Sequence, residues 1–235
     1  AWMMVNGFSI VLAIIGGLLT GVLIGLANGL LVKKLLIPSF IATLGTQYIA
    51  RSLTQVICNG KSIGGLPKQF SALGEYAFLK IAWYFWFLMI VVIVLSYLLR
   101  RQKSLAKLFY IGTNAQAADM VGIPSDRLTI YTFVASGFFA AVAGLILTAK
   151  SESASPISYE GMEMRYIAAA VIGGASISGG QGSVVGSVLG FLLVVLISNG
   201  MTLIGISPNW ENVIFGTILA VAAIADAFAH RNDAA

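Results

Sequence analysis

Apolar residues occur along the chain in long runs that do not alternate with polar residues. The runs predict seven helical segments, at 9–32, 38–58, 77–99, 128–148, 166–180, 184–204 and 212–229. Runs of about 18 or more apolar residues are typical of transmembrane helices, whereas the strands of a membrane barrel alternate. The fifth segment is short and rich in glycine, so we expect it to be broken or to span only part of a membrane. The pattern predicts an all-α, polytopic transmembrane helical bundle of about seven spans.

Composition supports the assignment to a membrane. Hydrophobic residues make up 58% of the 235 residues and charged residues 10%, whereas a soluble domain carries about 25% charged residues. The chain has one cysteine, Cys58, and one histidine, His230, so an internal disulfide or a histidine-rich metal site cannot form. The sequence also lacks a buried His, Cys or acidic constellation for catalysis. We therefore expect one transmembrane domain over residues 1–235, with no metal and no enzyme activity of its own.

Basic residues in the short polar stretches indicate the orientation of the chain, because cytoplasmic loops are enriched in Lys and Arg. One side of the seven-span layout collects Lys33, Lys34, Arg100, Arg101, Lys103, Lys107, Arg127 and Arg231. The other side has fewer basic residues, and glutamates offset them. This predicts a cytoplasmic loop at 100–127, a cytoplasmic C-terminus and an external Ala1, and it explains the net charge of +5 without a nucleic-acid partner. An external start without a signal peptide leads us to expect further helices before Ala1.

The 100–127 loop contains the signals of a short helix over 114–121. Thr113 and Gln116 have the spacing of a capping box, and Gly122 with Pro124 is a typical helix stop. The helix would be small and apolar for an exposed segment, since it contains Ala115, Ala117, Ala118, Met120 and Val121. Two interpretations remain open: the helix fits a groove on a partner protein, or it lies on the membrane surface.

Polar residues recur every fourth position in the second predicted helix. Each step of four residues turns the helix by about 40°, so these side chains form one slowly winding stripe: Thr43, Gln47, Arg51, Gln55 and Asn59. Polar groups in a membrane usually face a bundle interior or an aqueous cavity. The stripe would suit the translocation path of a hydroxyl-rich solute such as a sugar. Hydrogen bonding between helices, with Arg51 extending outward, is the alternative.

Glycines recur every fourth residue in two helices, at Gly17, Gly21, Gly25 and Gly29 and at Gly182, Gly186 and Gly190. Such spacing forms a groove that lets another helix backbone approach closely. The groove could serve packing within the chain, a seam between subunits or a sliding surface. The stretch with Gly173, Gly174 and Ser176 could interrupt a helix and line a transport path, or it could provide close packing.

Other classes of function have recognisable sequence signatures. An ion-coupled secondary transporter needs a carboxylate inside the membrane core, and Asp226, near the end of the seventh segment, is the one acid inside a predicted span. Asn59-Gly60-Lys61-Ser62 is similar to the end of a phosphate-binding loop, but Gln55 stands where that loop needs glycine. We therefore expect no nucleotide site on this chain.

Three stretches together resemble one transporter family. They are Pro38-Ser-Phe-Ile-Ala-Thr-Leu-Gly-Thr46 with Ile49-Ala-Arg51, Gly112-Thr-Asn114 with Ala117-Ala118 and Gly122-Ile123, and Ile167-Ala-Ala-Ala-Val-Ile-Gly-Gly-Ala-Ser176 with Gly179-Gly-Gln-Gly-Ser183. From its first helix to its C-terminus the chain resembles the ribose-type (simple-sugar) ATP-binding-cassette importer permeases.

The resemblance implies a bacterial inner-membrane permease of about ten helices, three of which would precede this chain. It also implies cytoplasmic ATPase subunits that hold ATP and Mg²⁺, a periplasmic or lipid-anchored sugar-binding protein, and a second permease copy or paralogue. The 100–127 loop would be the coupling loop, with Gly112, Thr113, Asn114, Ala117, Ala118, Gly122 and Ile123 at the ATPase contact. ATP binding by the partner would then drive alternating access, and the sugar carried stays open.

Overall fold

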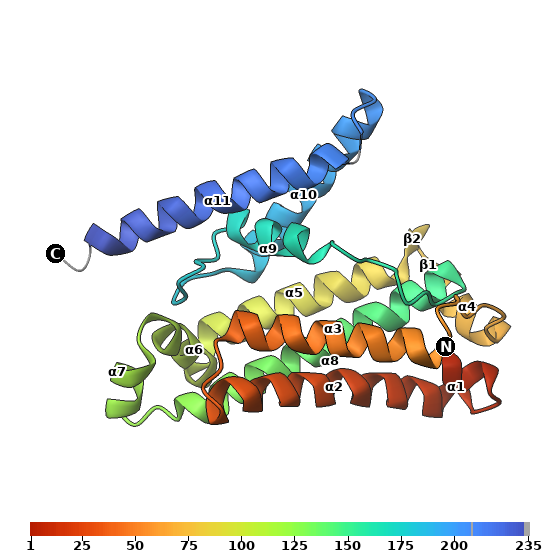
Figure 1. Cartoon of the computed structure of the whole chain (residues 1–235), viewed down its shortest axis with the longest axis horizontal. Helices are drawn as coiled ribbons and strands as arrows, with labels where there is room; N and C mark the ends of the chain where they lie inside the picture. Colours follow the sequence, from red (N-terminus) through yellow and green to blue (C-terminus); the bar gives the residue numbers. More distant parts are fainter. Residues whose placement is uncertain (208, 233–235) are drawn as a thin grey trace. The chain divides into compact units, whose positions relative to one another are not determined.

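The computed structural model describes residues 1–207 and 209–232, and in this part the chain is helical except for one small hairpin (Figure 1). The helices are α1 (Trp2–Val5), α2 (Ile10–Lys34), α3 (Ser39–Ile57), α4 (Lys68–Glu75), α5 (Trp83–Arg101), α6 (Lys103–Thr113), α7 (Ala115–Met120), α8 (Ser125–Ser151), α9 (Glu163–Ile172), α10 (Val184–Leu203) and α11 (Asn209–Asn232). Strands β1 (Ala77–Phe78) and β2 (Ile81–Ala82) pair antiparallel, with Phe78 opposite Ile81. The all-α fold class is confirmed.

Four helices of the described residues are long and apolar enough to cross a membrane: α2, α5, α8 and α10. Helix α9 has ten residues and is therefore about 15 Å long, half of the roughly 30 Å hydrocarbon core. The apolar part of α11 covers Trp210–Ile224. The number of spans, seven here and ten in all, stays a prediction, and the predicted cytoplasmic C-terminus at 233–235 lies outside the described residues.

Two predicted segments need correction. The third segment was expected to be helical from residue 77, but 77–82 forms the β1–β2 hairpin, because Leu79 and Lys80 have positive φ angles of 54° and 64°. Two such residues in succession are typical of a tight hairpin turn and cannot continue a helix. The fifth segment was expected to reach residue 180, but α9 ends at Ile172. Gly174, with a φ of +89°, follows at once, so the expected break by glycine is confirmed.

The described residues form two compact units: Ala1–Leu88 with Asp126–Ser158, and Met89–Ser125 with the described residues from Tyr159 on. In the first unit, α2 packs against α8 through glycines. A Cβ at Gly21 would overlap the carbonyl oxygen of Gly137 and lie 2.6 Å from the Cβ of Ala141. A Cβ at Gly25 would overlap the carbonyl oxygen of Phe133 in the same way. The two backbones are therefore in direct contact, which only residues without side chains allow.

Polar side chains connect further elements of the first unit. Thr46 of α3 donates a hydrogen bond to the side-chain oxygen of the buried Asn28 of α2 at 2.7 Å, and Figure 1 shows the two helices side by side. Lys33 of α2 forms an ion pair of 3.5 Å with Asp126 at the start of α8. At the other end of these helices a buried cluster fixes α1 and α4 to α2 and α8, and its members are Met4, Ala13, Leu66, Phe70 and Ala149.

The second unit has a similar glycine seam between α9 and α10. A Cβ at Gly173 would lie 2.6 Å from the backbone nitrogen of Ser187, and one at Gly190 would lie 2.8 Å from the nitrogen of Gly173. Helix α11 covers the same helices, since Phe215, 1% exposed, packs in a cluster with Ala168, Ala169 and Val194. Helices α9, α10 and α11 are therefore one packed group.

Candidate functional site

Helix α7 is a short helix with well-formed ends. The side-chain oxygen of Asn114 accepts a hydrogen bond of 2.9 Å from the backbone N–H of Ala117. At the other end, Gly122 has a φ of +78°, and the N–H of Ile123 donates to the carbonyl of Ala118 at 3.0 Å. This is a Schellman motif, whose left-handed residue is usually glycine. The predicted short helix over 114–121 is therefore present, at Ala115–Met120.

The predicted cap was wrong by one residue. Thr113 does not cap α7, because it is the last residue of α6 and its hydroxyl donates to the carbonyl of Phe109 at 3.1 Å. Sequence reasoning missed α6 and treated 100–127 as a loop. The signal was present: Leu105, Leu108 and Phe109 have the three- and four-residue spacing of a helix face. The predicted coupling loop therefore consists largely of two helices and the first residues of α8.

Both ends of α7 are connected to longer helices, while part of its surface is open. Asp119 accepts a hydrogen bond of 3.2 Å from the backbone N–H of Ser125, the first residue of α8. Ala118 is buried, but Met120 and Val121 are 88% and 76% exposed. Two adjacent, highly exposed apolar side chains at the end of a short helix are suited to insertion into a groove.

The start of this segment touches the glycine-rich loop between α9 and α10. A Cβ at Gly112 would overlap the backbone nitrogen of Gly180 and lie 3.1 Å from its Cα. Conversely, a Cβ at Gly179 would lie 2.6 Å from the carbonyl oxygen of Gly112. A Cβ at Gly180 would overlap the hydroxyl of Thr113. The last turn of α6 and the 179–180 loop are therefore in backbone contact.

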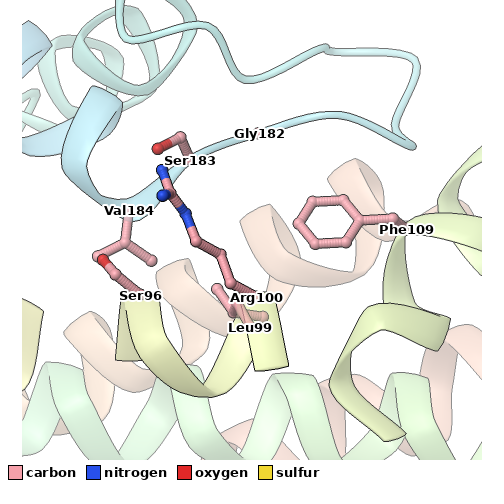
Figure 2. A pocket seen from close by; sticks show the side chains of 7 residues that line it. All are labelled: Ser96, Leu99, Arg100, Phe109, Gly182, Ser183 and Val184. Atoms are coloured by element: carbon pink, nitrogen blue, oxygen red, sulfur yellow. The ribbon is translucent and has the colours of Figure 1, made fainter. Parts of the chain in front are cut away.

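A shallow cavity of about 140 Å³ lies beside this contact, and Figure 2 shows its lining side chains. Arg100 extends from α5 toward Ser183, and Phe109 of α6 closes one side (Figure 2). Ser183 caps α10, since its hydroxyl accepts a hydrogen bond of 3.3 Å from the N–H of Gly186. The hydroxyl of Ser96 is buried with no hydrogen-bond partner among the described residues, so the cavity has a polar group for a water molecule.

The polar stripe of α3 lies in the first unit. Four of its five predicted members, Thr43, Gln47, Arg51 and Gln55, are half-buried, whereas Asn59 follows the end of α3 and is exposed. Thr43 donates to the Ser39 carbonyl of its own helix at 2.8 Å, and Arg51 donates to the Pro156 carbonyl beyond α8 at 3.4 Å. The guanidinium of Arg51 therefore bonds to protein, while the stripe keeps part of its surface open.

The other residues predicted for the path, Gly173, Gly174 and Ser176, belong to the second unit. Gly173 is half-buried in the α9–α10 seam, where a side chain would overlap the backbone of Gly186. Gly174 is exposed and has no atom within 4 Å of a Cβ position, and the backbone N–H of Ser176 donates to the Gln181 carbonyl at 3.2 Å. Among these three, Gly174 has the position of a residue that faces an open space.

The predicted packing glycines differ in their surroundings. Gly21, Gly25 and Gly29 contact α8, where a Cβ at Gly29 would lie 3.0 Å from the Cα of Ile130. Gly186 and Gly190 contact α9. Gly17 and Gly182 allow ordinary contacts, at 3.5 Å from Leu145 and 3.7 Å from Ala175. Five of the seven therefore lie at close helix contacts inside the chain.

The chain matches, over residues 1–223, the family described as the permease component of the branched-chain amino acid transport system. The chain belongs to this family. It is 36% identical over 228 residues to the ribose import permease protein of Bacillus subtilis, covering 96% of this chain and 71% of the relative. It is 34% identical over 220 residues to the autoinducer 2 import system permease protein of Photorhabdus laumondii, covering 94% of this chain and 66% of the relative.

A third relative, the autoinducer 2 import system permease protein of Yersinia pestis, is 32% identical over 91% of this chain and 61% of its own length. The chain thus spans about two thirds of the length of the curated relatives it matches. No solved structure matches it. The resemblance found in the sequence motifs is confirmed, and together with the long apolar helices it identifies a multi-pass membrane protein of a transport permease family.

Proposed function

We propose that this chain is the translocating permease subunit of an ATP-binding-cassette importer for a simple sugar in the bacterial inner membrane. The observation that carries the proposal is the family match over residues 1–223. The relatives' names support the substrate class, since one is a ribose import permease and two are autoinducer 2 import permeases. Ribose is therefore the first substrate to test.

In this proposal the protein's partners supply the free energy of ATP hydrolysis and the affinity for the sugar. Cytoplasmic ATPase subunits hold ATP and Mg²⁺, a sugar-binding protein delivers the substrate, and a second permease copy or paralogue completes the pathway. The chain itself binds no cofactor and catalyses no reaction. The basic residues of the 100–127 stretch support a cytoplasmic position for it and for the C-terminus.

Helix α7 is the proposed contact with the ATPase. The exposed Met120 and Val121 offer an apolar surface to a groove, and the Asn114 cap and Gly122 turn keep the helix formed without a partner. A preformed helix loses less conformational entropy on docking than a flexible loop. Movement of the ATPase would therefore displace α7 as a rigid body.

The solute would pass along the half-buried stripe of α3. Hydroxyl, amide and guanidinium groups match the hydrogen-bonding groups of a sugar, and Arg51 supplies the one charge among them. A weakly binding path fits an importer in which a separate binding protein provides selectivity, because conduction requires that the solute leave as readily as it enters.

The test uses the full-length protein purified in mild detergent with the partners that accompany it. After reconstitution with a sugar-binding protein, we expect uptake of D-ribose that requires ATP and persists when a protonophore collapses ion gradients. Gly122→Val should reduce this uptake strongly while the protein remains in the membrane, since a β-branched residue at a φ of +78° distorts the end of α7. Gly200→Val is the control, because Gly200 has open space and no positive φ.

Uptake without ATP that follows a proton or sodium gradient would overturn the proposal and favour an ion-coupled secondary transporter. That alternative needs a carboxylate in the membrane core. Its one candidate, Asp226, has a side chain outside the part of the structure that is described. Normal ATP-driven uptake by Gly122→Val would instead remove only the assignment of α7 as the coupling helix.

A further inference from the structure

The Gly179-Gly180 pair has no assigned role, yet it forms the one place where the α6–α7 segment meets the glycine-rich loop backbone to backbone in the described residues. Both glycines have left-handed φ angles, +97° and +77°. The loop is closed by its own hydrogen bonds: Ser176 N–H donates to the Gln181 carbonyl at 3.2 Å, and Gly179 N–H donates to the Ser176 carbonyl at 3.3 Å. The loop is therefore a turn with defined hydrogen bonds, and it contacts Gly112.

This turn leads directly into a membrane-length helix. Ser183, three residues after Gly180, caps α10 through the N–H of Gly186. Gly186 in turn lies in the seam with Gly173 of α9. Where two segments touch through side chains, a change of rotamer can accommodate a small displacement of one segment. Backbone atoms in contact cannot adjust in this way, and close-packed interfaces transmit strain. A displacement of α6 would therefore also displace the first turn of α10, because only a few residues separate the contact from that turn.

We propose that the contact of Gly112 with Gly179 and Gly180 is a rigid joint that transfers displacement of the α6–α7 segment to the N-terminus of α10. The joint rests on the proposed function, since it needs an ATPase that moves α7. Gly112, Gly179 and Gly180 act as positioning residues, which touch neither the sugar nor ATP. The joint explains why glycine lies on both sides of one contact: a side chain at Gly112 or Gly179 would overlap the backbone of the other segment, and one at Gly180 would overlap the Thr113 hydroxyl.

The first experiment adds a single methyl group at the contact between the two segments. Gly112→Ala places a Cβ against the backbone of Gly180, whereas Gly200→Ala, also in a helix of the second unit, adds a methyl group in open space. Both variants are made in the full-length protein with its partners, and ATP hydrolysis and D-ribose uptake are measured together. We expect Gly112→Ala to hydrolyse ATP but to import about tenfold less ribose per ATP, the effect of overpacking a tight contact. An unchanged ratio in Gly112→Ala would overturn the joint.

The second experiment crosslinks the two segments of the joint. It also tests the proposal if the Gly112→Ala variant fails to assemble. The Cβ of Thr113 and a Cβ at Gly180 would be 3.3 Å apart, close to the distance of about 3.5–4.5 Å found in disulfides. Thr113→Cys with Gly180→Cys, in a Cys58→Ser background, should therefore form a disulfide on oxidation. A rigid joint predicts that the oxidised protein imports ribose as fast as the reduced one. Uptake that stops on oxidation and returns on reduction would show that the segments separate, and would overturn the proposal.

The two experiments also distinguish failure of the joint from failure of the proposed function. The disulfide can be scored in membranes by gel mobility without any transport assay, so its absence would refute the contact alone. Unvaried protein that shows no ATP-driven uptake would refute the proposed function, whatever the state of the disulfide.

Discussion

Arg165 of α9 and Glu211 of α11 form a largely buried ion pair, and its loss should weaken the second unit. The side chain of Glu211 is 7% exposed and that of Arg165 is 24% exposed. The Arg165 guanidinium also lies over the ring of Phe215, 5.6 Å from its centre. The pair thus sits directly on the cluster that joins α9, α10 and α11.

The size of the effect follows from what Glu211→Gln leaves behind. Breaking a buried ion pair by removing one partner costs about 3–5 kcal/mol, because the remaining charge is stranded. Here the remaining charge is Arg165, which keeps about a quarter of its surface in contact with solvent and retains a cation–π contact worth about 0.5–2 kcal/mol. We therefore expect a loss of about 2 kcal/mol, which lowers the melting temperature of a chain of this length by about 4–8 °C.

Thermal unfolding of the full-length protein in mild detergent measures this loss. The control is Glu152→Gln, which removes the same charge from an exposed position and should leave the melting temperature within about 2 °C, as expected for a surface change. The double variant Arg165→Met with Glu211→Leu should recover most of the stability, because well-packed apolar residues replace a buried ion pair at little cost. A Glu211→Gln melting temperature equal to that of the control would refute the reasoning, as would a double variant less stable than the single one.

Two further predictions concern the first unit. Gly25→Ala forces α2 away from α8 and should lower stability by about 1–3 kcal/mol, measured as a lower melting temperature. Gly45→Ala, a helical glycine with open space, should not, and equal effects of the two would contradict the close α2–α8 contact. Arg51→Ala should reduce ribose uptake if the stripe lines the path, while the exposed neighbour Ser52→Ala should have no effect. Unchanged uptake kinetics in Arg51→Ala would assign the stripe to packing instead.

The positions of the helices could be predicted from the sequence because hydropathy in a membrane chain is strong and local. The predicted 9–32 and 184–204 correspond to α2 at Ile10–Lys34 and α10 at Val184–Leu203. The errors occurred where the backbone departs from hydropathy. Residues 77–82 are as apolar as the helix that follows, and the turn depends on positive φ angles at Leu79 and Lys80, which neither residue type announces.

The candidate site was predictable only in part. A glycine such as Gly122 before a proline indicates a helix end by local rules, and the structure has one there. Gly112 and Gly180 carry no such information about each other, because a glycine indicates either a close approach or a special φ without naming the partner. From the sequence, Gly173 could either line a transport path or provide close packing, and only its neighbours show that it lies in the α9–α10 seam. Contacts between segments that are distant in the sequence could therefore not be predicted from the sequence.

Glycine contacts distinguish two pairs of helices in backbone contact from α3, whose glycine has open space. Helices α2 and α8, and likewise α9 and α10, touch through backbone atoms, so a displacement within either pair would disrupt a close contact. Helix α3 has no such seam in the described residues: its Gly45 is open, and Thr46 contacts α2 through a side-chain hydrogen bond. Side-chain hydrogen bonds can exchange partners at small net cost, since each contributes about 1 kcal/mol. We therefore expect α3, which carries the polar stripe, to change its contacts more readily than the helices of the two glycine-paired seams.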